Sequence, residues 1–476
     1  MTRVEKHLLI IFGATGDLTR RKLLPSLYTL VTTKDIANQC IVLGVAPSAL
    51  DDDSYRSWAY TALAEAGHDE PEARAWCDRR LFFERVDRDA RSYDGLRRRI
   101  EAVEAELDLE GNRVFYLALP PAAFPPVIEA LGEAGLSSGP GWTRLVIEKP
   151  FGSDLASAQE LNALVHRYFG EDQLYRIDHY LGKETVQNLL TFRFSNPMFE
   201  SVWNRDRIAS VEITVAEEIG IGTRARYYDS AGVVRDMVQN HLTQVMALVA
   251  MEPPINFDAD QIRNEKVKVV EAVAPISPEK VVFGQYEAGT IDGTPVPAYR
   301  DEEGVPDGST TPTFADVDLE IDTWRWQGVP FRLRTGKRLA KRLTQIVVTF
   351  RLPPLCIFHG RRDDCPMKPN VLVITLQPDE GFTLRFNVKA PGQDLALDPQ
   401  ALRFDYGEAY KDLPDAYQTL ILDIMEGDQT LFVRSDEVEE SWRLWEPLLE
   451  NGGKPLPYQA GTWGPTPPSA FAELDE

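Results

Sequence analysis

Short apolar runs alternate with amphipathic stretches over the first part of the chain. The apolar runs lie at residues 7–12, 40–46, 80–86, 112–120 and 143–152. Stretches with helical spacing follow them at residues 19–31, 53–67, 94–107, 120–135 and 153–170. Strands that alternate with helices of this length predict a parallel sheet with right-handed crossovers.

After about residue 200 the hydrophobic period changes. Segments that resemble strands follow one another at residues 209–218, 316–326, 330–336, 344–352, 370–378 and 382–390. Several of them alternate apolar and polar residues with a period of two, which predicts a large, mainly antiparallel sheet. Helical stretches flank it at residues 233–251, 415–427 and 436–450, and residues 286–313 are typical of a long surface loop.

The length of the chain indicates the number of domains, and its net charge excludes some classes of binding partner. A chain of 476 residues exceeds one ordinary hydrophobic core, so two domains are expected. The net charge of -23 argues against nucleic-acid and anionic-membrane partners, because both are polyanions. No stretch approaches the roughly 20 apolar residues of a membrane span, and the start of the chain does not resemble a signal peptide.

The four cysteines are Cys40, Cys77, Cys356 and Cys365. They form no CxxC pair and no disulfide framework, which predicts a reducing, cytoplasmic location. Cys356, His359 and Cys365 lie within ten residues of one another, but no fourth ligand is evident, and the spacing is not a common zinc pattern. We therefore expect no metal.

A glycine turn follows the first predicted strand. IIFGATGDLTRRK places Gly13 and Gly16 between a strand and a helix, where a dinucleotide-binding turn belongs. The spacing is GxxG and not GxGxxG, so a plain strand-to-helix turn is the alternative. Asp17 is expected to cap or brace the turn. Residues 20–22, Arg-Arg-Lys, either face phosphate or are solvated.

Two further motifs follow predicted strands of the first part. Lys149 lies in EKPFG and is expected at the edge of a cofactor site, because ligands of doubly wound sheets gather at the carboxyl ends of strands. RIDHYLGKE supplies His179, Tyr180 and Lys183, three donors suited to a sugar phosphate. Asp178 of the same motif can orient an imidazole. The alternative is a structural network of buried polar residues.

A second histidine lies in RDMVQNHL, where Asp236 precedes His241 by five residues. A histidine on an amphipathic helix is often a packed core residue, but a carboxylate-oriented histidine is the usual general base near neutral pH. Pairing of His241 with Asp178 would create that dyad. RTGKRLAKR adds Lys337 and Arg342 as cations for a substrate cleft.

These motifs, in this order, resemble the glucose-6-phosphate dehydrogenase family. The matching strings include GATGDLTRRKLLPSLY, EKPFG, RIDHYLGKE, RDMVQNHL, VPFRLRTGK and DAYQTLILDIMEGD, and the resemblance covers nearly the whole chain. It implies an α/β Rossmann domain over residues 1–176. An α+β domain with a large, mostly antiparallel sheet is implied for residues 177–476, with roles in substrate binding and dimerisation.

The resemblance also implies a reaction and its residues. Glucose 6-phosphate would be oxidised at C1 to the 6-phospho-lactone, the first step of the oxidative pentose phosphate pathway. His241 would be the catalytic base and Asp178 its orienting carboxylate. The implied sugar-phosphate contacts are Lys149, His179, Tyr180, Lys183, Glu217, Asp236, Lys337, Arg342 and Gln377. The implied cofactor contacts are Gly13, Thr15, Gly16, Asp17 and Lys149.

One departure concerns the cofactor. The family usually has an arginine after the second strand that holds the NADP 2′-phosphate, and the matching residue here is Pro47. Thr15, Ser48 and the Arg20–Arg21 pair could compensate in part, whereas the acidic residues 51–53 would repel a phosphate. NADP is the default of the family, and NAD stays possible.

Two other functions are considered. One is a sugar dehydrogenase of the glucose–fructose oxidoreductase type, against which the complete RIDHYLGKE string weighs. The other is a non-catalytic nucleotide sensor, which loss of His241 or Asp178 would have signalled. By resemblance, the protein is expected to form a homodimer or homotetramer.

Overall fold

A computed structural model of the chain describes residues 4–34, 36, 38–87, 90–357, 367–392, 396–410, 413–451 and 453–468. Internal contacts divide the chain into two compact units. Unit 1 contains residues 1–183, 256–263 and 414–439, and unit 2 contains residues 184–255, 264–413 and 440–476. Both units are thus discontinuous along the chain, whereas the sequence predicted two continuous domains that meet at residue 176.

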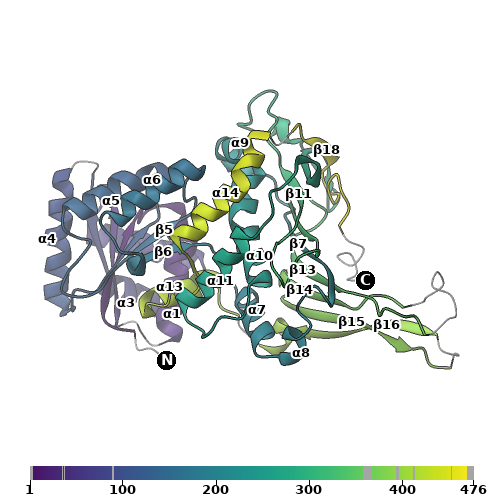
Figure 1. The fold of residues 1–476 in the computed structure, drawn as a ribbon. Helices are drawn as coiled ribbons and strands as arrows, with labels where there is room; N and C mark the ends of the chain where they lie inside the picture. Colours follow the sequence, from purple (N-terminus) through teal and green to yellow (C-terminus); the bar gives the residue numbers. More distant parts are fainter. Residues whose placement is uncertain are drawn as a thin grey trace. The chain divides into compact units, whose positions relative to one another are not determined.

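Unit 1 is built on a sheet whose strands run in the order β17-β6-β5-β4-β1-β2-β3. Figure 1 labels β5 and β6 of this sheet. The strands are β1 (His7–Phe12), β2 (Cys40–Ala46), β3 (Leu81–Arg85), β4 (Arg113–Leu117), β5 (Thr143–Glu148), β6 (Leu174–Ile177) and β17 (Phe432–Val433). Neighbouring strands from β3 to β6 are parallel, and only β17 is antiparallel to its neighbour among the described strands. This is the doubly wound order of a Rossmann sheet.

Helices connect these strands, as the alternating pattern predicted. They are η1 (Thr19–Leu23), α1 (Leu24–Thr33), α2 (Asp52–Glu65), α3 (Pro71–Arg80), α4 (Ala90–Leu107), α5 (Phe124–Glu133), α6 (Leu155–His166) and α13 (Ala416–Glu426). All six residues of β1 and all seven of β2 are buried, which explains why their sequences are continuous apolar runs. Side chains of β1, β4 and β5 form the centre of one hydrophobic core.

Unit 2 is built on a sheet in the order β16-β15-β14-β13-β7-β12-β11-β8-β18. Its strands are β7 (Ile208–Ala216), β8 (Val281–Glu287), β11 (Phe314–Leu319), β12 (Phe331–Gly336), β13 (Leu343–Phe350), β14 (Val371–Gln377), β15 (Gly381–Lys389), β16 (Leu397–Asp405) and β18 (Leu456–Gln459). Among the described strands, pairing is antiparallel except for β7 with β12 and β8 with β18. The predicted fold class, a Rossmann domain plus a large mostly antiparallel sheet, is confirmed.

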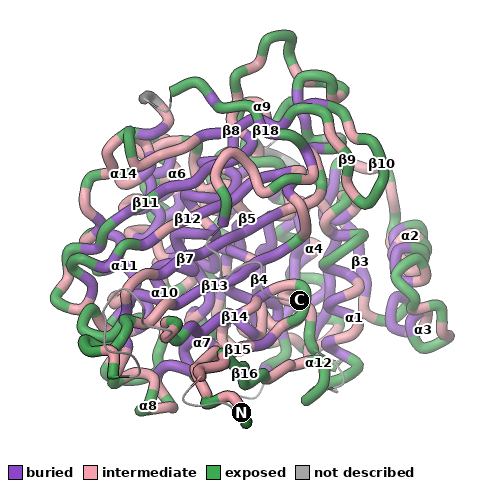
Figure 2. The backbone as a smooth tube through the Cα atoms, turned by 90° about the vertical axis from the view of Figure 1, so that its right-hand side faces the viewer, coloured by how far each residue is buried: buried purple, intermediate pink, exposed green. Residues whose placement is uncertain are grey.

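The helices that lie wholly or partly in unit 2 include α7 (Glu184–Phe194), α8 (Pro197–Glu200), α9 (Ala225–Val233), η5 (Val234–Leu242), α10 (Thr243–Ala250), α11 (Ala259–Glu271), α12 (Tyr406–Ala409) and α14 (Ser435–Asn451). Of these, α11 and α14 cross a boundary between the units. Figure 2 shows the central strands β7 and β13 as buried, in agreement with their alternating but largely apolar sequences. No helix in the described part of the chain combines the length and apolar character needed to cross a bilayer.

Several local predictions differ from the structure. The strand predicted at residues 316–326 ends at Leu319, because turns follow it. The loop predicted at residues 286–313 contains a small hairpin of β9 (Gly289–Ile291) and β10 (Thr294–Val296). Strands β8 and β16 were not predicted, since their half-polar sequences lack strict alternation.

Candidate functional site

The turn after β1 has the geometry of a dinucleotide-binding loop. Gly13 has φ +81, and a Cβ atom there would collide with the carbonyl oxygen of Ala118, the residue that follows β4. The Gly16 amide donates to the Gly13 carbonyl at 2.9 Å and closes the turn. Thr19 Oγ1 donates to the same carbonyl at 2.9 Å. The glycines thus leave backbone accessible at the start of the following helix, where a pyrophosphate binds.

The charges beside this turn are paired with one another. Arg20 forms an ion pair with Glu65 on α2. The Asp17 carboxylate lies 2.8 Å from Arg21 Nε, so it pairs one helical turn onward and does not cap the helix. Positive and negative charge therefore cancel locally at the surface near the turn.

The end of β2 carries hydroxyl groups and an acid that caps a helix. Thr15 Oγ1 and Ser48 Oγ lie 3.3 Å apart, which links the glycine turn to the residue after Pro47. Asp51 accepts a hydrogen bond from the Ser54 amide and caps α2. Hydrogen bonding from the Ser54 side chain and then from its amide lowers the pKa of the Asp51 carboxyl group. The Asp51 carboxylate therefore stabilises the first turn of α2.

The carboxyl ends of β5 and β6 meet at one edge of the unit 1 sheet. The two strands are parallel neighbours, and Glu148 pairs with Ile177. Lys149 and Asp178, the next residue of each strand, therefore lie side by side along that edge. This is the placement that the sequence predicted for both motifs.

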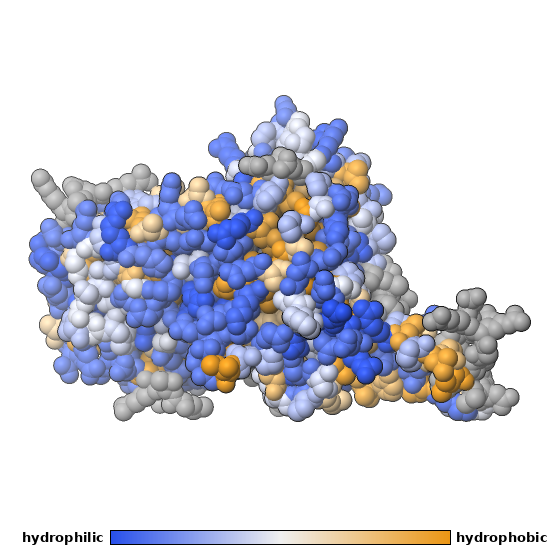
Figure 3. Space-filling model, viewed as in Figure 1, coloured by the Kyte–Doolittle hydropathy of each residue, from blue (hydrophilic) through white to orange (hydrophobic). Residues whose placement is uncertain are grey.

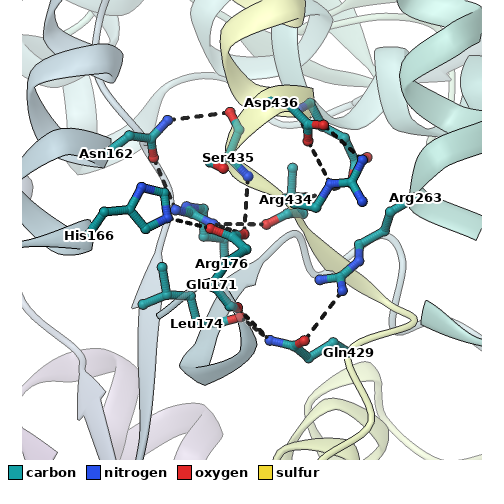
Figure 4. A network of polar contacts seen from close by, with 12 residues as sticks. Asn162, His166, Glu171, Leu174, Arg176, Arg263, Gln429, Arg434, Ser435 and Asp436 are labelled. Carbon is teal, nitrogen blue, oxygen red and sulfur yellow. Dashed lines mark hydrogen bonds and ion pairs between the residues drawn. The ribbon is translucent and has the colours of Figure 1, made fainter. Parts of the chain in front are cut away.

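Arg176 belongs to RIDHYLGKE but is structural. Its side chain is 2% exposed, and Nη1 lies 2.6 Å from Glu171 Oε1 while Nη2 donates to Asn162 Oδ1 at 3.0 Å. Figure 4 shows these groups in one polar network with Ser435, whose amide donates to Glu171. The network holds β6 to the segment 414–439, so the alternative of a buried polar network applies to this one residue of the motif.

The rest of RIDHYLGKE forms a compact turn after β6. Asp178 Oδ1 accepts a hydrogen bond from the Tyr180 amide at 3.0 Å, and the Leu181 amide donates to the Asp178 carbonyl. Lys183 Nζ lies 4.0 Å from the centre of the Tyr180 ring, and the His179 and Tyr180 rings are 5.1 Å apart. The three predicted phosphate donors are thus neighbours within unit 1.

In unit 2, one parallel strand pair creates a charged cluster. Gly336 of β12 pairs with Ala216 of β7, so Lys337 and Glu217 follow side by side. Lys337 Nζ lies 2.6 Å from Glu217 Oε2 and 3.6 Å from Asp236 Oδ2. The Lys337 side chain is 3% exposed, which makes this a buried cation between two acids.

The strand register brings the remaining sugar candidates to the same end of the unit 2 sheet. Leu343 of β13 pairs with Ala216, so the exposed Arg342 lies alongside Glu217. Gln377 ends β14 and pairs with Thr344 of β13. Sequence positions as far apart as 217 and 377 therefore meet at one end of the sheet.

His241 lies on the π-helix η5 and is 1% exposed. Its backbone amide donates to Asn240 Oδ1 at 2.7 Å. The helix is anchored from α14, where Ser441 Oγ donates to the Gln239 carbonyl and Trp445 Nε1 donates to Thr243 Oγ1. π-helical turns occur frequently at functional sites. Asp178 and His241 belong to different units, so their pairing stays a prediction.

The segment with Cys356, His359 and Cys365 is only partly described. Cys356 is disulfide-bonded, which the sequence did not predict, so it is not a free thiolate. His359 and Cys365 lie outside the described residues.

The sequence missed three residues near the candidate site of unit 1. Glu148 Oε1 accepts hydrogen bonds from Tyr116 of β4 at 2.7 Å and from Tyr417 of α13 at 3.3 Å. The pKa of Glu148 is raised to about 7, chiefly by burial and in smaller part by the Asp178 charge, against the opposing effect of the tyrosine hydrogen bonds and Lys149. The only signal in the sequence was the position of Glu148 directly before Lys149.

A doubly wound sheet with a glycine turn, joined in one chain to an antiparallel-sheet unit with a Lys-Glu-Asp cluster, defines a two-domain nicotinamide-dependent oxidoreductase. Models of "Glucose-6-phosphate dehydrogenase, NAD binding domain" and "Glucose-6-phosphate dehydrogenase, C-terminal domain" match residues 10–188 and 190–476. The chain therefore belongs to the glucose-6-phosphate dehydrogenase family, and its cofactor is a nicotinamide dinucleotide. The resemblance seen in the sequence is confirmed.

Similar proteins cover nearly the whole chain. Glucose-6-phosphate 1-dehydrogenase of Aggregatibacter actinomycetemcomitans is 44% identical, with 98% of this chain and 95% of that protein covered. The Bacillus subtilis enzyme is 42% identical, with 97% and 95% covered. A solved glucose-6-phosphate dehydrogenase in complex with glucose 6-phosphate has a TM-score of 0.89 and 37% identity, with 99% and 97% covered. These matches do not favour either alternative function.

Proposed function

We propose that the protein oxidises glucose 6-phosphate at C1 to the 6-phosphoglucono-lactone, with hydride transfer to a nicotinamide dinucleotide. This is the entry step of the oxidative pentose phosphate pathway. The observation that carries the proposal is the neighbouring placement of His179, Tyr180 and Lys183 after β6, in a chain whose relatives are named for this reaction. A dianionic phosphate matches three clustered donors.

His241 is the base in this proposal. It takes the proton of the C1 hydroxyl, and Asp178 orients the imidazole and stabilises its charged form. When bound, the nicotinamide accepts the hydride from C1. The 6-phosphate lies far from C1 in the sugar, so the clamp of residues 179, 180 and 183 supplies orientation and not chemistry.

The remaining site residues hold the sugar and the cofactor. Lys149 reaches both, because it lies at the sheet edge where β5 and β6 end. The residues proposed for the sugar are Glu217, Asp236, Lys337, Arg342 and Gln377. Those proposed for the cofactor are Gly13, Thr15, Gly16 and Asp17.

For the cofactor we propose use of both dinucleotides, with NAD at least as good as NADP. Pro47 supplies no positive charge, and the two candidate compensating arginines pair with Glu65 and Asp17. These ion pairs are exposed and weak, so NADP is still accommodated. The experiment is steady-state reduction of NAD and of NADP at saturating glucose 6-phosphate, in which no turnover with either would refute the proposed reaction.

Replacement of Pro47 by Arg is expected to shift the NADP-to-NAD ratio of kcat/KM toward NADP by roughly tenfold or more, about 1.4 kcal/mol. The added guanidinium gives the 2′-phosphate a bidentate partner. The variant Pro47→Gln is the control, because it removes the proline without adding charge. An equal shift in both variants would attribute the effect to the backbone, and no shift would place the 2′-phosphate elsewhere.

Lys183→Ala is expected to raise the KM for glucose 6-phosphate by roughly ten- to a hundredfold, since a hydrogen bond to a charged group contributes about 1.5–3 kcal/mol. The KM for the dinucleotide should change little. Lys34→Ala serves as the control, because Lys34 is an exposed lysine at the end of α1 in the same unit. An unchanged KM for the sugar phosphate would remove Lys183 from the clamp.

We further propose that the protein is cytoplasmic and forms a homodimer or homotetramer through the β15–β16 side of its sheet. β16 is an edge strand, and large apolar groups nearby are exposed, among them Leu402 and Tyr410. Figure 3 shows hydrophobic residues gathered at this end of unit 2. Exposed apolar surface at a sheet edge favours association, and sedimentation of Leu402→Lys against the parent protein tests it.

A further inference from the structure

The start of α13 touches three segments that the proposed function assigns to ligands. Asp415, which caps the helix, lies 3.1 Å from Lys22 Nζ in the helix after the glycine turn. A Cβ atom on Gly182 would lie 2.7 Å from the Ala416 carbonyl oxygen, so RIDHYLGKE packs directly on the first turn. Tyr417 reaches Glu148, the neighbour of Lys149.

The Tyr417 contact is one of two tyrosine hydrogen bonds to Glu148, and the other comes from Tyr116. Both tyrosine hydroxyls donate to the same carboxylate oxygen, Oε1 of Glu148. Burial raises the pKa of Tyr116 and of Tyr417 well above the usual value, so both hydroxyls stay protonated donors near neutral pH. Each of the three residues comes from a different element, β5, β4 or α13.

We propose that Glu148 is a positioning residue: with Tyr116 and Tyr417 it fixes Lys149 and sets how strongly Lys149 holds the anionic ligands. The inference rests on the proposed function, which gives Lys149 its ligands. Glu148 is the last residue of β5, so two hydrogen bonds on its side chain anchor the backbone from which Lys149 extends.

The charge of Glu148 changes how strongly Lys149 binds an anionic ligand. The groups that face the Glu148 carboxyl are Lys149, Asp178 and the two tyrosines. Glu148 has a pKa of about 7, so it is mostly neutral below that pH and ionised above it. Ionisation adds a negative charge beside Lys149 and Asp178, which opposes an anionic ligand. The KM for glucose 6-phosphate is therefore expected to rise by roughly threefold to tenfold as pH passes through about 7.

The same shift affects stability with a defined sign. The folded-state pKa of Glu148 lies above the usual 4.5 of a glutamate, so the stabilising contribution is fully present below about pH 4.5 and is lost as pH rises from there through about 7. Glu148→Gln removes this loss. Its Tm relative to the parent protein is expected to increase from about pH 4.5 to about pH 7 and to stay level above that, whether or not the enzyme is turning over.

The test measures KM and kcat for glucose 6-phosphate from pH 6 to pH 9. Glu148→Gln should abolish the step in KM while kcat keeps its own pH profile. Tyr417→Phe and Tyr116→Phe should move the step to higher pH, because each loses a donor that favours the ionised carboxylate. Tyr55→Phe is the control, since Tyr55 is a buried tyrosine of unit 1 whose hydroxyl has no hydrogen-bond partner among the described residues.

The outcomes separate the two proposals. Absence of turnover in the parent protein would overturn the proposed function and this inference together. Turnover with the parent step in KM retained at the same pH in Glu148→Gln would overturn the positioning role alone. A step that moves equally in Tyr55→Phe would also overturn it, because the effect would then be general to buried tyrosines.

Discussion

Replacement of His241 by Asn is expected to lower kcat by about 10²–10⁴-fold, the usual contribution of a positioned general base. The KM for glucose 6-phosphate should change little, because the phosphate clamp lies on another segment of the chain. Asn keeps a polar side chain of similar size, so the packing of the 1% exposed His241 is largely preserved. Steady-state kinetics with either dinucleotide measures the effect.

His68→Asn is the matched control for that experiment. His68 is also a histidine beside a carboxylate, because its Nδ1 atom lies 3.9 Å from Glu70 Oε1. Its ring packs against Tyr28 of α1 and is not among the proposed site residues. Its replacement should leave kcat unchanged. Near-normal turnover of His241→Asn would remove His241 as the base and with it the proposed dyad with Asp178.

The first sheet was predictable because its information is local. Each strand of unit 1 from β1 to β5 is a short apolar run, and each is followed by a helix with a clear period. The role of Gly13 was predictable because a glycine between a strand and a helix is typical of a dinucleotide-binding turn. The structure adds the steric reason, since a Cβ atom at Gly13 would collide with the Ala118 carbonyl. The motifs at the ends of β5 and β6 then fell at the same sheet edge for topological reasons alone.

The parts that were missed depend on distant pairings. The sequence of α13 predicts a helix, but nothing in it says that Tyr417 bonds to Glu148, 269 positions earlier, and that the segment folds with unit 1. Likewise, alternation in β7 and β12 indicates strands but not their parallel pairing. That pairing is what brings Glu217 and Lys337 together.

The pairing of β7 and β12 also predicts a large loss of stability when Lys337 is replaced. Lys337→Met is expected to lower the free energy of unfolding by about 3–5 kcal/mol, because it leaves two acids at a buried site without their cation. Asp236 is buried, and Glu217 loses a partner at 2.6 Å. The measurement is Tm, and the KM for glucose 6-phosphate should rise as well.

An exposed ion pair with nearly the same distance is the control for this experiment, because it differs from the Lys337 pair in burial. Lys280 Nζ lies 2.7 Å from Glu320 Oε1, nearly the same distance, but both side chains are about half exposed. Lys280→Met should therefore lower the Tm much less than Lys337→Met does, because an exposed ion pair contributes little to stability. The variant Lys337→Met with Asp236→Asn should recover part of the Tm, because one uncompensated charge is gone, but it should not recover substrate affinity. Equal losses for Lys337→Met and Lys280→Met would show that the cluster contributes no more than a surface ion pair, and the buried charge would then need another source of stabilisation.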